Sequence, residues 1–218
     1  MSTDLWLIGC GRVFETIAVS WAAIEPETVL HVVRLDSPDN IAEPFEGRIA
    51  DATDDAHFFA AVDQNALNFA RLDLYARLRL SGHKFRSLQH PTAAVDPAAQ
   101  IGENCWIGAH ALIGAGAKLG HNTFVETAAI VLEGADVGAN AWIGAAARVG
   151  TEARLGTHCV VGSGVSLASG ITIGRYCSIE RPGHYSTPLA DRTYIDPLFE
   201  NPVYIFQKPR PRPELRPD

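Results

Sequence analysis

The stretch that decides the fold reads Ile101-Gly102-Glu103-Asn104-Cys105-Trp106-Ile107-Gly108-Ala109-His110-Ala111-Leu112-Ile113, and it is one part of a longer repeat. From residue 95 to residue 179 an aliphatic side chain returns at every sixth position. These positions are Val95, Ile101, Ile107, Ile113, Leu119, Val125, Val131, Val137, Ile143, Val149, Leu155, Val161, Leu167, Ile173 and Ile179. An unbroken hexapeptide period is typical of a parallel β-helix, in which three short strands make one coil.

The repeat also predicts how the core of this β-helix is built. The aliphatic side chains point into a triangular prism and stack at the inter-strand spacing of about 4.8 Å. A small residue, most often Ala, stands four places after most of the aliphatic ones and fills the remaining space. Burying one such aliphatic side chain is worth roughly 1.5–3 kcal/mol. We therefore expect about five coils with a continuous apolar core.

Composition sets limits on the class of protein. The 218 residues are 47% hydrophobic and 20% charged, as in ordinary globular proteins, and the net charge of −7 argues against a nucleic acid partner. The sequence has no apolar run long enough for a membrane span and no leader, so we expect a cytoplasmic protein. Cys105, Cys159 and Cys177 fall on the small interior positions and are expected to fill the core, without disulfide, metal or catalytic roles.

The residues before the repeat predict a small α/β unit. Residues 4–36 follow a strand–helix–strand pattern, with Gly9 and Gly11 at the first turn and Asp36 after the second strand. In a nucleotide site, such glycines let phosphate approach the helix amino terminus, and the acid accepts a ribose hydroxyl bond. The full G-x-G-x-x-G pattern is absent, because Phe14 stands where the third glycine belongs. A tight turn in a purely structural unit therefore remains an equal alternative.

A second strand–helix pair and a change of pattern complete the domain division. Residues 58–62 predict a strand and residues 65–80 a helix that ends near Gly82. We expect an amino-terminal Rossmann-like nucleotide-sugar-binding domain over residues 1–88, the β-helix over 89–182 and a carboxy-terminal extension over 183–218. The extension includes a Pro/Arg-rich tail that should be extended.

The run Phe58-Phe59-Ala60-Ala61-Val62-Asp63-Gln64-Asn65-Ala66-Leu67, the helix after it, and His90-Pro91-Thr92-Ala93 before the hexads resemble the NeuD/PglD-type sugar acyltransferases. The resemblance covers about residues 4–180. It implies a Rossmann-like domain joined to a left-handed β-helix in a homotrimer, and transfer of an acetyl group from acetyl-CoA to the amine of a nucleotide-linked sugar. It also implies a nucleotide-sugar contact near Gly9, Gly11 and Asp36, and a coenzyme A groove between neighbouring prisms, with no metal.

The catalytic residues of that family are replaced here. Glu133 stands at the position of the general-base histidine, Gly134 at that of the following acid, and Trp142 at that of a second histidine. Glu133 could serve as the base if burial at a subunit groove raised its pKa; alternatively it is an exposed turn residue in a site without catalysis. The resemblance implies the backbone amide of Thr151, one coil later, as the oxyanion donor.

His184 is the runner-up for the base. Residues 173–179 resemble the antibiotic-modifying hexapeptide acyltransferases, whose histidine lies on an excursion loop, and His184 follows this segment. A structural loop residue is the alternative.

Two columns recur at the coil spacing. Asn104, Asn122, Asn140 and His158 predict a polar ladder of turn residues, with His158 at a solvated corner. The outward-facing aromatic column of Trp106, Phe124 and Trp142 must be covered by something, and a trimer interface is our first expectation, with a sugar or adenine platform as the alternative.

Two functions remain open. The first is an acyl-CoA-dependent N-acyltransferase acting on a nucleotide-linked amino sugar in surface polysaccharide or glycan biosynthesis. The second is an inactive or repurposed relative that binds a nucleotide sugar or a partner protein. A zinc carbonic anhydrase of the β-helix class needs two histidines five residues apart, and no pair in this sequence has that spacing.

Overall fold

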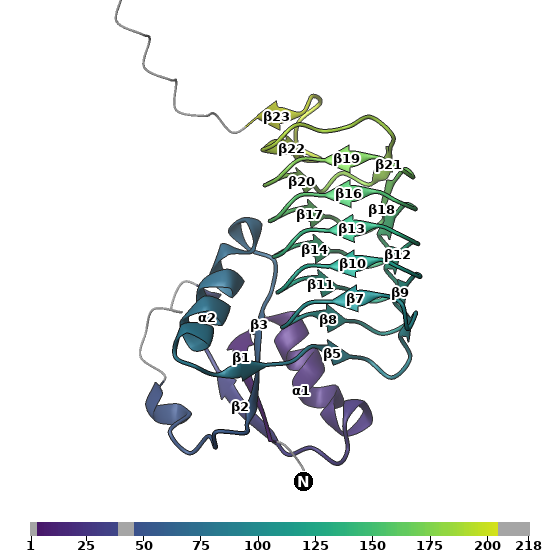
Figure 1. Ribbon diagram of the computed structural model, residues 1–218. Coiled ribbons are helices and arrows are strands. Elements are labelled where there is room, and N and C mark those ends of the chain that lie inside the picture. Colours follow the sequence, from purple (N-terminus) through teal and green to yellow (C-terminus); the bar gives the residue numbers. More distant parts are fainter. Residues whose placement is uncertain (1–3, 39–45, 205–218) are drawn as a thin grey trace, which may run out of the picture.

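The computed structural model describes residues 4–38 and 46–204, and the basic, proline-rich tail considered above lies outside these ranges. The chain forms a parallel sheet with two α-helices, followed by a parallel β-solenoid of about six turns (Figure 1). None of the helices within the two described segments has the length and the apolar run that a bilayer crossing requires.

The first unit is a small parallel sheet with helices on both of its faces. Its described strands are β1 (Leu5–Cys10), β2 (Leu30–Arg34), β3 (His57–Val62) and β4 (Lys84–Phe85), in the order β2-β1-β3-β4. Its helices are α1 (Arg12–Ile24), α2 (Phe69–Leu80) and the short 3-10 turns η2 (Glu46–Arg48) and η3 (Ala66–Asn68). Side chains alternate along β1: Leu5 and Leu7 pack with α1, whereas Ile8 packs on the opposite face with Leu74 of α2.

The predicted helix over residues 65–80 has a broken first turn. Leu67 and Asn68 have positive φ values of 56° and 66°, so η3 precedes α2 as a separate turn. The helix ends at Leu80, and Gly82 follows with φ of 92°, the left-handed conformation that favours glycine after a helix.

The solenoid is built from very short strands that pair with the strand one coil away. Along the described chain, one sheet has the order β19-β16-β13-β10-β7, a second β23-β22-β20-β17-β14-β11-β8-β5 and a third β21-β18-β15-β12-β9-β6. The strands are β5 (Leu88–Gln89), β6 (Ala94–Val95), β7 (Gln100–Ile101), β8 (Trp106–Ile107), β9 (Leu112–Ile113), β10 (Lys118–Leu119), β11 (Phe124–Val125), β12 (Ile130–Val131), β13 (Asp136–Val137), β14 (Trp142–Ile143), β15 (Arg148–Val149), β16 (Arg154–Leu155), β17 (Val160–Val161), β18 (Val165–Leu167), β19 (Thr172–Ile173), β20 (Ser178–Ile179), β21 (Gly183–Tyr185), β22 (Thr193–Ile195) and β23 (Val203–Tyr204).

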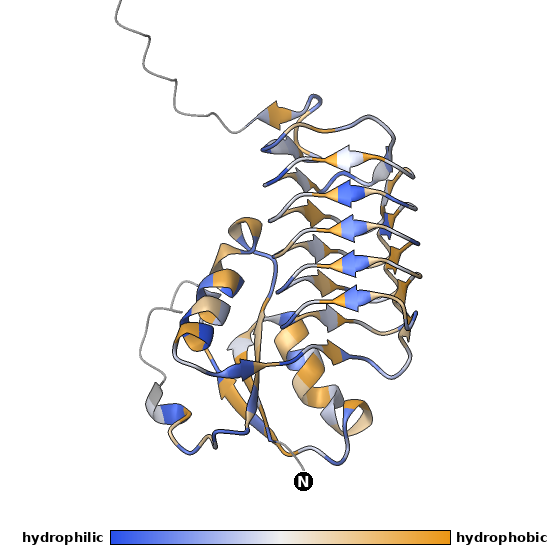
Figure 2. Cartoon of the chain, viewed as in Figure 1, coloured by the Kyte–Doolittle hydropathy of each residue, from blue (hydrophilic) through white to orange (hydrophobic). Residues whose placement is uncertain are grey.

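The interior of the solenoid follows the hexad pattern. The repeated aliphatic and alanine positions form one buried cluster along its axis. Cys105, Cys159 and Cys177 are fully buried in this cluster and fill the core, as predicted. Each outer strand position of the β7–β16 sheet is polar, and these strands show blue in Figure 2.

Strand pairing continues beyond residue 182, where the hexad pattern placed the end of the β-helix. β21 pairs with β18 and β22 pairs with β20, both in parallel. The interior positions of this coil are Tyr185, Leu189 and Ile195, which keep neither the six-residue spacing nor the aliphatic type throughout. The solenoid therefore has more coils than the five expected, and antiparallel β23 borders β22 at its far end.

The aromatic column on the β8–β14 sheet is covered by the first unit of the same chain. Trp106, Phe124 and Trp142 are 3%, 0% and 6% exposed, in one apolar cluster with Phe14 and Ile17 of α1. Figure 1 shows α1 beside β5 and β8. The expectation that a trimer interface covers this column is wrong, because an intramolecular contact already buries it.

The polar ladder forms as predicted, but it is buried. Asn104 donates to Asn122 (2.6 Å), Asn122 donates to Asn140 (2.8 Å), and Asn140 lies 3.4 Å from His158 Nε2. His158 is 5% exposed, and its Nδ1 lies 2.9 Å from the Leu67 carbonyl oxygen. The expectation of a solvated corner at His158 is wrong, because η3 covers it.

Candidate functional site

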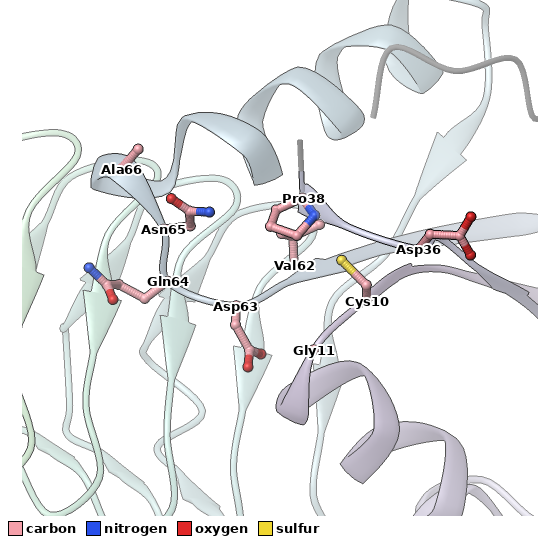
Figure 3. Close-up of a pocket in the computed structure, with 9 residues that line it drawn as sticks. All are labelled: Cys10, Gly11, Asp36, Pro38, Val62, Asp63, Gln64, Asn65 and Ala66. Carbon is pink, nitrogen blue, oxygen red and sulfur yellow. The ribbon is translucent and has the colours of Figure 1, made fainter. Parts of the chain in front are cut away.

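A pocket of about 540 Å³ lies at the carboxyl ends of β1 and β3, where parallel sheets commonly bind ligands. We call it the strand-end pocket (Figure 3). Its described lining consists of Cys10, Gly11, Asp36, Pro38, Val62, Asp63, Gln64, Asn65 and Ala66. The fold thus brings together two of the three residues predicted for nucleotide-sugar binding, Gly11 and Asp36.

Gly9, the third, has a packing role. A Cβ atom at this position would lie 1.7 Å from the backbone carbonyl oxygen of Ala61, so only glycine allows β1 to approach β3 this closely. Gly9 is not among the described residues that line the strand-end pocket.

Gly11 makes room for a side chain that the sequence analysis did not single out. A Cβ atom at Gly11 would lie 2.7 Å from the Asp63 carboxyl carbon. The Asp63 carboxylate accepts hydrogen bonds from the backbone N–H of Arg12 (2.7 Å) and of Val13 (2.9 Å), the first amides of α1. A helix amino terminus carries a partial positive charge, and here a carboxylate of the chain itself neutralises it.

Cys10 is the partly exposed thiol of the chain, and it lines this pocket. Burial, and to a smaller extent the negative charge of Asp63, raise the pKa of the Cys10 thiol above its ordinary value. The described lining of the pocket therefore has two carboxylates, those of Asp36 and Asp63.

An ion pair between an exposed arginine and a buried glutamate joins α1 to the solenoid close to this pocket. Arg12 donates to the Glu126 carboxylate at 2.5 Å, and Glu126 is 5% exposed while Arg12 remains largely exposed. Desolvation raises the pKa of Glu126 above its ordinary value, although Arg12 opposes the shift. Sequence reasoning missed Glu126; the signal was a charged residue directly after Val125, where glycine follows most of the aliphatic positions.

Glu133, the predicted base, lies at an exposed corner of the solenoid. It borders a second, open hollow of about 610 Å³, whose described lining also includes residues of β6 and β9. Thr151 lies one coil further, and its hydroxyl donates to the Glu133 carboxylate at 3.4 Å. The structure thus brings the predicted base and the predicted oxyanion residue together, and within one chain it leaves Glu133 in contact with solvent.

His184, the runner-up, belongs to the solenoid. It lies in β21, exposed, with Nδ1 3.2 Å from the Ser166 hydroxyl oxygen. Successive pairing of β12, β15, β18 and β21 puts it three coils from the strand that precedes Glu133, about 14 Å along the axis. The expectation of an excursion loop is not met, and the two base candidates do not form one site within the chain.

The remaining departures from the family pattern have structural consequences. Trp142, at the position of a second histidine, is buried beneath the first unit and is closed to a substrate. Gly134, at the position of the acid, has φ of 65°, a corner conformation that glycine adopts without strain. Among the described residues no three His, Cys, Asp or Glu side chains are grouped as metal ligands.

Comparison with known proteins places these features in context. Residues 89–182 match the family described as the GMPPB C-terminal domain, which is less than half of the chain. No curated protein matches the sequence.

Several solved structures share the fold over most of the chain. A histidine-to-alanine variant of GDP-perosamine N-acetyl transferase from Caulobacter crescentus, in complex with CoA and GDP-perosamine, has a TM-score of 0.74 at 22% identity, covering 88% of this chain and 92% of that chain. The acetyltransferase domain of PglB from Neisseria gonorrhoeae, in complex with acetyl coenzyme A, has a TM-score of 0.58 at 24% identity, covering 89% and 96%. WeeI from Acinetobacter baumannii has a TM-score of 0.55 at 12% identity, covering 88% and 96%.

These identities are below 25%, so the similarity concerns the fold. At this level the resemblance to the sugar acyltransferases, predicted from the sequence, is confirmed.

Proposed function

We propose that this protein transfers an acyl group, with acetyl as the first expectation, from acyl-CoA to the amine of a nucleotide-linked sugar in surface polysaccharide or glycan biosynthesis. The observation that carries the proposal is the shared fold, sheet unit and solenoid together, with a GDP-perosamine N-acetyl transferase whose structure contains CoA and GDP-perosamine. Function depends on sites placed on a fold, so the site residues need their own support.

In this proposal residues 1–88 act as a Rossmann-like domain that binds the nucleotide sugar. The strand-end pocket lies at the carboxyl ends of the parallel strands, with Gly11 in its wall. Asp36 is exposed within it and would accept a hydrogen bond from a sugar hydroxyl. Gly9 contributes by permitting the close packing of β1 against β3.

Residues 89–182 supply the chemistry. The amine nitrogen attacks the thioester carbonyl, Glu133 accepts the proton that the nitrogen loses, and the thiolate of coenzyme A leaves. The Thr151 amide would donate to the oxygen on which negative charge develops. Because Glu133 is exposed in a single chain, a second copy must cover it, and the homotrimer implied by the resemblance supplies that cover.

Calorimetric titration with acetyl-CoA, followed by thiol release with a panel of nucleotide-linked amino sugars, tests the proposal. Saturable binding near one site per chain is expected. Glu133→Gln should lower kcat by about 100-fold and leave acetyl-CoA binding unchanged, because it removes only the proton acceptor. Glu152→Gln is the matched control, an exposed carboxylate on the same edge of the solenoid that has no assigned role. Unchanged turnover in Glu133→Gln would remove Glu133 from the mechanism, and His184→Asn would then be measured.

A second function, binding of a nucleotide sugar or a partner protein without acyl transfer, is favoured by one observation. Trp142 and Gly134 stand at the positions of the family's second histidine and acid, and Trp142 is buried in the contact with α1. Absence of acetyl-CoA binding at millimolar concentration, together with retained nucleotide-sugar binding, would support this second function over the first.

A further inference from the structure

The amino end of α1 borders the strand-end pocket, and this helix end already has an anionic partner. Both carboxylate oxygens of Asp63 accept backbone hydrogen bonds, from Arg12 at 2.7 Å and from Val13 at 2.9 Å. In nucleotide-binding α/β folds the corresponding amides are the ones that receive a ligand phosphate. In this chain a phosphate could reach them only by displacing Asp63.

Two features of the backbone fix the position of Asp63: the strand that precedes it and the glycine that lies opposite its carboxylate. Asp63 directly follows β3, which pairs with β1 in parallel register up to Cys10 and Val62. Gly11 has φ of 99°, and a side chain there would meet the Asp63 carboxylate at 2.7 to 3.0 Å. The glycine therefore opens the turn for Asp63, a role different from the one that the sequence pattern suggested.

The rest of the pocket offers little to a phosphate. Its described lining includes no Lys, Arg or His, but it does include the carboxylates of Asp36 and Asp63 and the side-chain amides of Gln64 and Asn65. The neighbouring guanidinium of Arg12 is already paired with buried Glu126. Such a lining complements hydroxyl and amino groups that donate hydrogen bonds.

We propose that Asp63 is a specificity-determining residue that holds the amino end of α1 in place of a ligand phosphate. The strand-end pocket then binds the uncharged, hydrogen-bond-donating nucleoside part of a nucleotide sugar. The diphosphate makes no stabilising contact with the amino end of α1. This inference rests on the proposed nucleotide-sugar binding and assigns which part of that ligand the pocket recognises.

Cys10 provides a readout that does not depend on catalysis. It lines the pocket and is partly exposed, whereas the other three thiols are fully buried in the solenoid. The ratio of Cys10 alkylation rates with and without ligand, followed by intact mass, therefore measures occupancy of the pocket. Taking the ratio within each variant cancels any change in the intrinsic reactivity of the thiol.

The probes are guanosine, GDP, uridine and UDP, titrated against wild type, Asp63→Asn and Asp63→Ser. In wild type we expect the better nucleoside and its diphosphate to protect Cys10 with dissociation constants within about threefold of each other. Asp63→Ser should lower the dissociation constant of the diphosphate by about tenfold, because the helix amides become available to it. The dissociation constant of the nucleoside should not change. Asp63→Asn, which removes only the charge, should give an intermediate gain.

The controls separate this inference from the proposed function. Asp136→Asn removes an exposed carboxylate on the solenoid and should behave as wild type. One result would overturn the role of Asp63: a wild-type protein that binds the diphosphate about tenfold more tightly than the nucleoside, with no tighter binding in either Asp63 variant. This result would not contradict the proposed nucleotide-sugar binding. Absence of protection by all four probes in every variant, with thermal melts showing folded protein, would overturn both.

Discussion

At the scale of a single residue, Arg71 carries a positive charge into the contact between α2 and the solenoid. It is fully buried, and its guanidinium donates to the carbonyl oxygens of Val62 (3.1 Å), Asn122 (3.2 Å) and Ala141 (3.2 Å). The guanidinium carbon lies 4.2 Å from the ring centroid of Phe124. Desolvation lowers the pKa of Arg71 to about 9, so the side chain remains charged at neutral pH.

Arg71→Lys should lower the stability of the protein. A lysine keeps the charge but cannot reach carbonyls in three directions or stack as a plane on Phe124, so buried acceptors lose their donors. We expect the urea midpoint to fall by an amount equivalent to about 3 kcal/mol. Arg79→Lys, on the same helix but exposed and paired with Glu103, should change stability by less than about 0.5 kcal/mol. Equal midpoints for the two variants would contradict a structural role for the Arg71 guanidinium.

The burial of Arg71 carried a signal in the sequence. Arg71, Leu74 and Leu78 follow a spacing of three and four residues, which is one helical face. The helix predicted over residues 65–80 is present as α2 from Phe69 to Leu80, but the prediction did not consider that its apolar face could include a charged residue. What the spacing could not reveal is the set of partners, because two of the three acceptor carbonyls belong to the solenoid.

At the scale of an element, the corners of the solenoid use left-handed residues in two different ways. Asn122 has φ of 59°, is fully buried, and belongs to the hydrogen-bonded ladder that η3 and β3 cover. Ala128 has nearly the same φ, 56°, at an exposed corner of the same coil. The backbone conformation is similar at the two positions, but asparagine tolerates it better than alanine, and only Asn122 contributes side-chain hydrogen bonds.

Replacing each of these residues by glycine separates the two contributions. Ala128→Gly relieves left-handed strain and should be neutral or stabilise by up to about 1 kcal/mol. Asn122→Gly gains less relief, because asparagine tolerates the left-handed conformation, and it leaves ladder groups unpaired, so we expect a loss of about 1–3 kcal/mol. Thermal and urea unfolding of the two variants measure the difference. A stabilised Asn122→Gly protein would show that the ladder adds nothing to the stability of the fold.

The solenoid is also the element that the sequence predicts best. A six-residue period fixes which side chains point inward, so strands β6 to β20 and the buried cysteines could be expected without a structure. The coil containing Tyr185, Leu189 and Ile195 was missed because its inward residues are not evenly spaced. Hydrogen-bonded pairing with strands of the preceding coil holds this coil in place although its sequence lacks the six-residue period.

At the scale of the whole molecule, the sequence predicted that the aromatic column must be covered. It did not predict which part of the protein covers it. Covering it requires α1 to lie against β8, β11 and β14, and nothing in a linear pattern states how two units dock. The same limit applies to the site. Arg12 begins α1 in the first unit, whereas Glu126 belongs to the solenoid, so only the docked structure joins these two residues. Asp36 and Gly11 were predictable, because strand ends of one parallel sheet meet at one edge.

The shared core predicts that the sheet unit and the nearby coils open together. Phe14 and Ile17 of α1 form one cluster with Phe124 and Trp142, so separating the units would expose apolar surface on both. Solenoids otherwise unfold coil by coil through nearest-neighbour contacts. Hydrogen exchange read by mass spectrometry should therefore give equal protection in α1 and in β8 to β14, and lower protection toward β22. Arg71→Lys should speed exchange equally in α1 and in β8 to β14, and acceleration confined to α1 and α2 would show that the two units open independently.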